Sequence, residues 1–259
     1  MTWLEYVVAI AFVLACSVSS SLLLLHRARG IIVHEQECGI ATPRIREIAS
    51  VLGAVAGLAI GAIVLFFAEQ TASVNVIEWV GRGSYLLVTG AVAGHLLILI
   101  RTTIHLQAEE AAWASKGEPP KGTLSYQRLR VLSRFRRYHR HYGDLKMRDD
   151  RALEELVGVL GTPLLNARND LSRIPFYGYL GTVCGILLMA QQLGRINEAT
   201  ETFKVLSSMA NGLVLAFQTT LVALLAFLPL RKATDYLIRR LGRLEDMWTT
   251  ARDELVDQG

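Results

Sequence analysis

The hydrophobic residues of this chain fall into five long blocks separated by polar and charged segments. A helix that crosses a bilayer needs roughly 20 mostly apolar residues, and each block is of about that length. Within the blocks the apolar residues are nearly continuous and do not follow the three-to-four-residue repeat of a surface helix. The pattern predicts an all-α, polytopic membrane bundle of about five transmembrane helices, two of them extended into the cytoplasm. The blocks are Leu4–Leu25, Ile48–Ala68, Val80–Ile100, Pro175–Leu193 and Ser207–Leu230.

Composition supports a membrane protein and disfavours two other classes. Hydrophobic residues make up 52% of the chain and charged residues 19%, and the mean hydropathy is +0.34. The net charge of +4 is explained by basic loops at one side of a membrane, and no basic patch has interleaved aromatics of the kind usual in nucleic-acid binders. We therefore expect a lipid bilayer as the environment and no nucleic acid as a partner. Cys16, Cys38 and Cys184 have neither metal-ligand nor disulfide spacing, so we expect no metal site.

The charges between the blocks predict the orientation. The longest segment, Arg101–Arg173, holds 14 Lys/Arg against 9 Asp/Glu, whereas Glu69–Trp79 has two glutamates and no basic residue. Basic loops stay on the cytoplasmic side. All the basic-rich segments share one side when the N-terminus is outside and the C-terminus is cytoplasmic.

These features divide the chain into four parts. We predict an N-terminal transmembrane hairpin at 1–72, a third span with its cytoplasmic extension at 73–115, a cytoplasmic basic and helical region at 116–172, and a core helix pair with a cytoplasmic tail at 173–259. In the third part, the basic, aromatic-bearing stretch from Tyr126 to Tyr142 is either a solvated helix face or a site for anionic headgroups or an acidic partner. An amphipathic helix follows, bent at Pro163. In the tail, four apolar residues at helical spacing predict a stripe that packs on the other cytoplasmic helices: Leu237, Leu241, Leu244 and Trp248.

Small residues and one histidine distinguish the second and third blocks. Gly53, Gly57 and Gly61 recur every four residues, a spacing that lets another helix backbone approach closely. We predict that they form a packing surface. His95 lies inside the third block, where an ionisable side chain is a candidate proton relay. Alternatively, because Arg101 follows within two helical turns, His95 reaches the interface or bonds a neighbouring helix.

The last two blocks carry the most informative polar residues. Neither block contains Asp, Glu, Lys or Arg. In two antiparallel helices, Thr182 and Thr220 lie at a similar depth, about 10–15 Å from the cytoplasmic boundary. We expect the small residues around them, Gly178, Gly181, Gly185, Ala216 and Ala223, to leave room for a facing helix or a few water molecules. A driven proton path ordinarily includes an ionisable group, so if these helices line such a path, the carboxylate must come from another chain. No catalytic constellation occurs, and we do not expect an enzyme.

Both threonines lie in segments that resemble a known family. Tyr179–Ile186 contains Gly-Thr-Val-Cys-Gly, which is similar to the Gly-Thr-Val-x-Gly motif of the MotA/TolQ/ExbB proton-channel family. Leu215–Pro229 resembles that family's Ala-Leu-x-x-Thr-x-x-Gly-Leu-x-x-Ala-x-x-Pro. The sequence departs from the family in having Ala223 at the usual glycine and in having five spans, where TolQ and ExbB have three and MotA four.

The resemblance implies a proton-channel subunit of an ion-driven rotary motor or energy transducer in a bacterial inner membrane. Five copies would surround a dimer of single-span MotB/TolR/ExbD-like partners, each bringing a membrane aspartate. Thr182 and Thr220 would then line the ion path, with Thr219 as the neighbouring candidate, and protons rather than a cofactor would be the coupling species. The alternative is a membrane scaffold whose glycine-rich helices serve oligomerisation without conducting ions.

Overall fold

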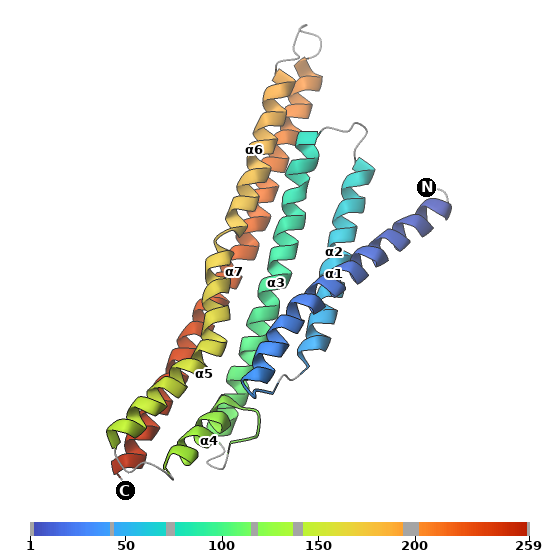
Figure 1. The fold of residues 1–259 in the computed structure, drawn as a ribbon. Coiled ribbons are helices and arrows are strands. Elements are labelled where there is room, and N and C mark those ends of the chain that lie inside the picture. The colour runs from blue at the N-terminus through green and yellow to red at the C-terminus, as the bar shows by residue number, and fades with distance from the viewer. Residues whose placement is uncertain are drawn as a thin grey trace. The chain divides into compact units, whose positions relative to one another are not determined.

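The chain forms a bundle of long helices. The computed structural model describes residues 3–41, 44–70, 76–114, 119–136, 142–193 and 202–257, and no strand occurs in these ranges (Figure 1). The all-α prediction is confirmed. The helices are α1 (Trp3–Glu37), α2 (Ile45–Gln70), α3 (Val76–Ala114), α4 (Leu124–Arg136), α5 (Tyr142–Leu171), α6 (Ile174–Leu193) and α7 (Thr202–Asp257).

Five helical segments within the described residues are long and apolar enough to cross a membrane. They contain the first four predicted blocks and all but the first two residues of the fifth, which confirms the polytopic membrane fold. The predicted extensions of the third and fifth spans are present in α3 and α7. We expected the first span to end near Leu25, but α1 continues to Glu37. It contains no proline, and the chain first adopts a left-handed conformation at Gly39, with φ of 70°, a common way for a helix to end.

The residues group into two compact units, each assembled from separate stretches of the chain. The first, here called the apolar unit, comprises Met1–Leu25, Ala49–Leu96 and Asn169–Arg231. The second, here called the charged unit, comprises His26–Ile48, Leu97–Arg168 and Lys232–Gly259.

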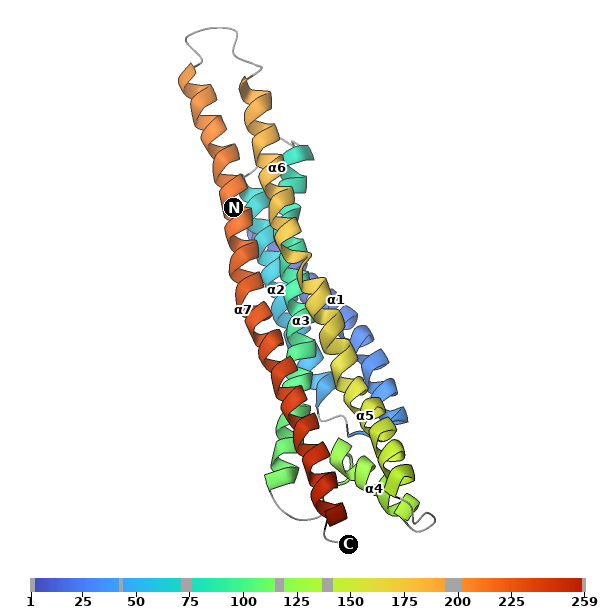
Figure 2. The same cartoon turned by 90° about the vertical axis from the view of Figure 1, so that its left-hand side faces the viewer.

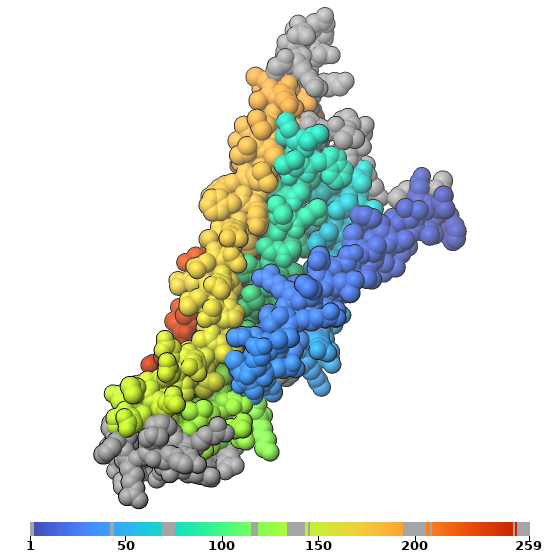
Figure 3. Space-filling view, in the orientation of Figure 1, coloured from blue at the N-terminus to red at the C-terminus, as the bar shows by residue number. Residues whose placement is uncertain are grey.

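In the apolar unit, the glycine stripe of α2 packs against α1. A Cβ added to Gly57 would overlap the backbone of Cys16 and Ser17, and one added to Gly53 would overlap that of Ser21. The hydroxyls of Ser17 and Ser21 donate to the carbonyls of Ala54 (3.2 Å) and Ser50 (3.1 Å). The predicted packing surface is confirmed. Many large apolar side chains of α1 are exposed, and Figure 3 shows this helix uncovered on the face in view.

An arginine of α3 that the sequence reasoning missed contacts the end of α2. Arg82 lies in the third block, yet only 9% of it is exposed. Its guanidinium donates to the carbonyl of Phe67 at 2.8 Å, pairs with Glu78 and lies 4.9 Å from the Phe67 ring centroid. Because Phe67 is in the last turn of α2, Arg82 satisfies a helix-end carbonyl that would otherwise lack a donor.

In the charged unit, the predicted stripe of α7 is buried. The exposed fractions of Leu237, Leu241, Leu244 and Trp248 lie between 1% and 6%, which confirms that it packs against other helices. Trp248 also lies 5.8 Å below the guanidinium of Arg128. Helix α5 continues through Pro163.

Arg128 shows that the basic stretch is not a uniform binding surface. Its guanidinium forms two hydrogen bonds with the fully buried Asp149, at 2.7 and 2.6 Å. Arg128 is therefore part of the interior and cannot contact headgroups or an acidic partner. Two other arginines of this stretch, Arg137 and Arg140, lie outside the described residues.

Candidate functional site

Helices α6 and α7 lie side by side (Figures 1 and 2) and bring two threonines together. The hydroxyl oxygens of Thr182 and Thr220 are 2.5 Å apart, a hydrogen-bonding distance at which either atom can donate. The same oxygens lie 3.1 and 3.2 Å from the carbonyl of Ala216. Both side chains are half-buried, so the pair lies at the edge of the helix interface. The similar depth expected from the sequence is what allows the two hydroxyls to meet.

The close approach of the two backbones depends on small residues. A Cβ on Gly178 would lie 2.8 Å from that of Ala223, and one on Gly185 would lie 2.8 Å from that of Ala216 and overlap the carbonyl of Gly212. Larger side chains at these positions would push the helices apart and separate the hydroxyls. Gly212 was missed by the sequence reasoning, although its spacing of four residues from Ala216 was a usable signal.

Thr219 and Thr220 are adjacent in sequence but point in different directions. Thr219 is 2% exposed, and its hydroxyl donates to the carbonyl of Leu215 at 2.9 Å. A Cβ on Gly181 would overlap the Thr219 side chain. Thr219 therefore fills the space between α6 and α7, while Thr220 faces Thr182.

The replacement of glycine by Ala223 has a structural explanation. Ala223 is fully buried, and the residue opposite its methyl group is Gly178. Because Gly178 on α6 has no side chain, there is room for the methyl group of Ala223, and a glycine on α7 is not needed. The helices can thus remain close despite the departure from the motif.

His95 lies on α3, in the interior of the apolar unit. It is 8% exposed, and its Nδ1 is 2.7 Å from the carbonyl of Ala91, one turn earlier on the same helix. Local bonding of this kind satisfies a polar group inside a membrane helix. The proposed relay role stays a prediction.

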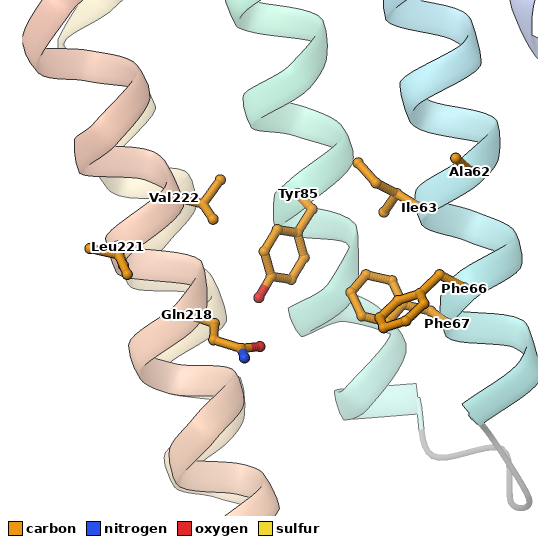
Figure 4. Close-up of a pocket in the computed structure, with 8 residues that line it drawn as sticks. All are labelled: Ala62, Ile63, Phe66, Phe67, Tyr85, Gln218, Leu221 and Val222. Atoms are coloured by element: carbon orange, nitrogen blue, oxygen red, sulfur yellow. The ribbon is translucent and has the colours of Figure 1, made fainter.

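An apolar groove lies between α2, α3 and α7 on another side of the site (Figure 4). Its volume is about 520 Å³, and its lining includes Phe66, Phe67, Tyr85 and Gln218. Gln218 precedes Thr220 by two residues, which is about 200° around a helix. The groove and the hydroxyl pair therefore occupy different faces of α7.

The chemistry available to the hydroxyl pair is limited to hydrogen bonding. Neither predicted membrane block of α6 or α7 contains a charged residue, and a threonine hydroxyl does not ionise at physiological pH. Among the described residues, no group of three or more His, Cys, Asp or Glu side chains is placed to hold a metal ion. The pair can orient a water molecule or a partner's carboxyl group.

Residues 170–250 match the sequence model of the MotA/TolQ/ExbB proton channel family. The matched segment contains α6, most of α7 and the hydroxyl pair, which confirms the resemblance seen in the two motifs. Helices α1 to α4 lie outside it. No curated protein and no solved structure gives a significant match to the chain.

Proposed function

We propose that this chain, which carries a MotA/TolQ/ExbB segment, is the channel-forming subunit of a proton-driven energy transducer. The observation that carries the proposal is the Thr182–Thr220 hydroxyl pair, 2.5 Å apart on two charge-free helices of the matched segment. The pair forms the polar wall of the ion path and orients the group that carries the proton.

The proton-carrying group comes from another chain. The predicted membrane blocks of α6 and α7 lack Asp and Glu, and hydroxyls alone are poor proton carriers in hydrocarbon. As in the family, we propose a dimer of single-span partners, each with a membrane aspartate, inside a homopentamer of this chain. Proton entry along this path drives rotation of the ring against the partner pair. One charge crossing 100 mV releases about 2.3 kcal/mol.

The direction of the two neighbouring hydroxyls supports Thr220 as the residue that faces the path. Thr219 is enclosed between α6 and α7 and is bonded to backbone carbonyls. Thr220 is half-buried and in contact with Thr182. We assign Thr219 a packing role.

The positions of the charges support the orientation expected from the sequence. With the N-terminus outside and the C-terminus in the cytoplasm of a bacterial cell, the basic Arg101–Arg173 segment stays on the inner side of the cytoplasmic membrane. Single-cysteine labelling of intact cells at each end of the chain tests this orientation.

Valine substitutions test the ion path, because valine keeps the shape of threonine and removes the hydroxyl. We expect Thr182→Val and Thr220→Val each to reduce proton flux more than tenfold in liposomes that contain the chain and its partner, and the double variant to abolish it. Thr89→Val is the matched control, because Thr89 is a half-buried membrane threonine that donates to the carbonyl of Tyr85 on its own helix. Full flux in the double variant contradicts the proposed path.

The mass of the purified complex tests the assembly. A ratio of five copies of this chain to two copies of a single-span, aspartate-bearing protein supports the proposal. A stable oligomer that forms without such a protein and conducts no protons supports the scaffold alternative. Against the scaffold, the glycines of α2 and α6 are already engaged in contacts within the chain.

A further inference from the structure

Three buried charged or titratable side chains meet in the charged unit, outside the segment matched by the family. Glu35, near the end of α1, is fully buried, and Arg101 and His105, one turn apart on α3, are 2% and 5% exposed. The Nε of Arg101 donates to Oε1 of Glu35, and Nε2 of His105 lies 2.9 Å from the same oxygen. Burying an ion costs several kcal/mol even after relaxation, so these contacts are what keeps the charges inside the protein.

The contacts determine which ring nitrogen of neutral His105 carries the hydrogen. A carboxylate paired with a guanidinium only accepts hydrogen bonds. Neutral His105 must therefore carry its hydrogen on Nε2 and donate it to Glu35, which leaves Nδ1 as the basic nitrogen. A proton that binds Nδ1 changes the net charge of the cluster from zero to +1, and the Nε2–Glu35 hydrogen bond persists in both states.

Two polar atoms of the cluster lack a hydrogen-bond partner that a bound water would supply. Oε2 of Glu35 and Nη1 of Arg101 are buried and have no hydrogen-bond partner among the described residues. One is an acceptor and the other a donor, so a single water molecule can satisfy both. Buried waters ordinarily bridge unsatisfied polar groups in this way.

The charged groups around the cluster are themselves engaged. Glu109, one turn beyond His105 on α3, accepts hydrogen bonds from the backbone amides of Leu124 and Ser125 at the start of α4. Arg128 of α4 is paired with Asp149. Within the described residues, the charged side chains that pair with Glu35 are Arg101 and, once protonated, His105.

The cluster lies where three helices are tied together. The backbone amide of Ile40 donates to the carbonyl of Glu35 at 2.9 Å, and the side chain of Gln127 on α4 donates to the carbonyl of Gly39 at 2.7 Å. The end of α1, the start of α4 and α3 all meet here. A change of charge in the cluster therefore acts on the contacts of all three helices.

We propose that Glu35, Arg101 and His105 form a proton-binding site of the charged unit, with Nδ1 of His105 as the atom that takes the proton. Glu35 holds the imidazolium by its negative charge, and Arg101 opposes it by its positive charge. The site is separate from the Thr182–Thr220 pair, and the proposal does not depend on ion conduction by the chain.

Nuclear magnetic resonance of the full chain in nanodiscs, with ¹³C at the histidine Cε1, tests this site. His105→Gln identifies the signal of this residue, which we expect to change as the imidazole takes up a proton. Glu35→Gln removes the attracting charge and should lower the midpoint by about one pH unit, or tenfold in proton affinity. Arg101→Gln removes the repelling charge and should raise it. A signal that does not titrate, or a midpoint unmoved by both substitutions, overturns the proposal.

His34 is the matched internal control. It lies on the same end of α1, exposed, with its Nδ1 3.9 Å from Glu37, and its midpoint should stay constant in both variants. Glu35→Gln leaves Arg101 buried without its counter-charge and can prevent folding. In that event Arg101→Gln decides alone: a raised His105 midpoint supports the site, and an unchanged or lowered one overturns it.

Discussion

The apolar unit contains two helix pairs built on the same principle, α1–α2 and α6–α7, and they differ in what their hydroxyls do. In both pairs, glycines bring two backbones together so closely that a Cβ would overlap the facing helix. Between α1 and α2, Ser17 and Ser21 each donate to a single carbonyl of the other helix. Between α6 and α7, Thr182 and Thr220 bond each other.

The comparison separates packing from function. A serine that donates to a carbonyl has used its only hydrogen, and the contact explains its presence in a membrane helix. Two hydroxyls that bond each other use one hydrogen for that bond, and the second can be donated either to the Ala216 carbonyl, at 3.1 or 3.2 Å, or to a third group. Glycine stripes with hydroxyls therefore do not mark an ion path by themselves. A half-buried pair of hydroxyls can, in addition, form a hydrogen bond with a group of another chain.

Valine at one glycine of each helix pair should have the largest effect on the two contacts. Gly185→Val would place two methyl groups against Ala216 and the carbonyl of Gly212 and should destabilise the fold by about 3 kcal/mol. Proton flux should be lost, because α6 and α7 must separate. Gly57→Val, which overlaps Cys16 and Ser17 on α1, should destabilise the fold by a similar amount but keep measurable flux.

Unfolding in mixed micelles and flux in liposomes measure the two effects separately. Gly83→Ala is the control, since no atom lies within 4 Å of a Cβ added there, and it should change neither. If Gly57→Val assembles as the wild type does but loses proton flux, the α1–α2 hairpin also belongs to the ion path.

Replacing each of the two adjacent threonines by valine tests which hydroxyl of α7 faces the ion path. Thr220→Val should reduce flux more than tenfold with little loss of stability. Thr219→Val should lower stability by about 1 kcal/mol and retain most of the flux, because its hydroxyl is bonded to the carbonyls of Leu215 and Ala216. The reverse result, with Thr219→Val inactive, would assign the path to Thr219.

The sequence was sufficient for the features that depend on local pattern. Apolar blocks predicted the five spans, and four-residue glycine spacing predicted the contact of α2 with a neighbour. The direction of Thr219 was not predictable, because adjacent helical positions are separated by 100° and only the position of α6 decides which one is enclosed. The Glu35–Arg101–His105 cluster joins residues 66 and 70 positions apart, and no local spacing indicates such a contact.

Removing the serine hydroxyls of α1 should have a smaller effect. The Ser17→Ala and Ser21→Ala double variant loses two hydrogen bonds to α2, and interhelical bonds of this kind contribute about 0.6 kcal/mol each in membranes. We expect a stability loss of about 1 kcal/mol and unchanged flux. Ser133→Ala, whose hydroxyl is exposed and donates to Arg130 on its own helix, is the control. A tenfold loss of flux in the double variant would contradict the purely structural role of these serines.

Ala223→Gly should have the smallest effect, and it tests how the chain accommodates a departure from the family motif. The methyl group of Ala223 is fully buried and faces Gly178, so its removal should cost about 1 kcal/mol, mainly through the greater backbone freedom of glycine. Flux should stay within about twofold of wild type, because the Thr182–Thr220 distance is set by several glycines of α6 rather than by this one residue. Gly178→Ala should be tolerated when it is combined with Ala223→Gly. The pair then still has one methyl group, now on α6 instead of α7. If Ala223→Gly restores neither stability nor flux to Gly178→Ala, the two residues are not a complementary pair, and position 178 is restricted by the backbone of Thr219 and Thr220, whose nearest atoms lie 3.3 and 3.1 Å from an added Cβ.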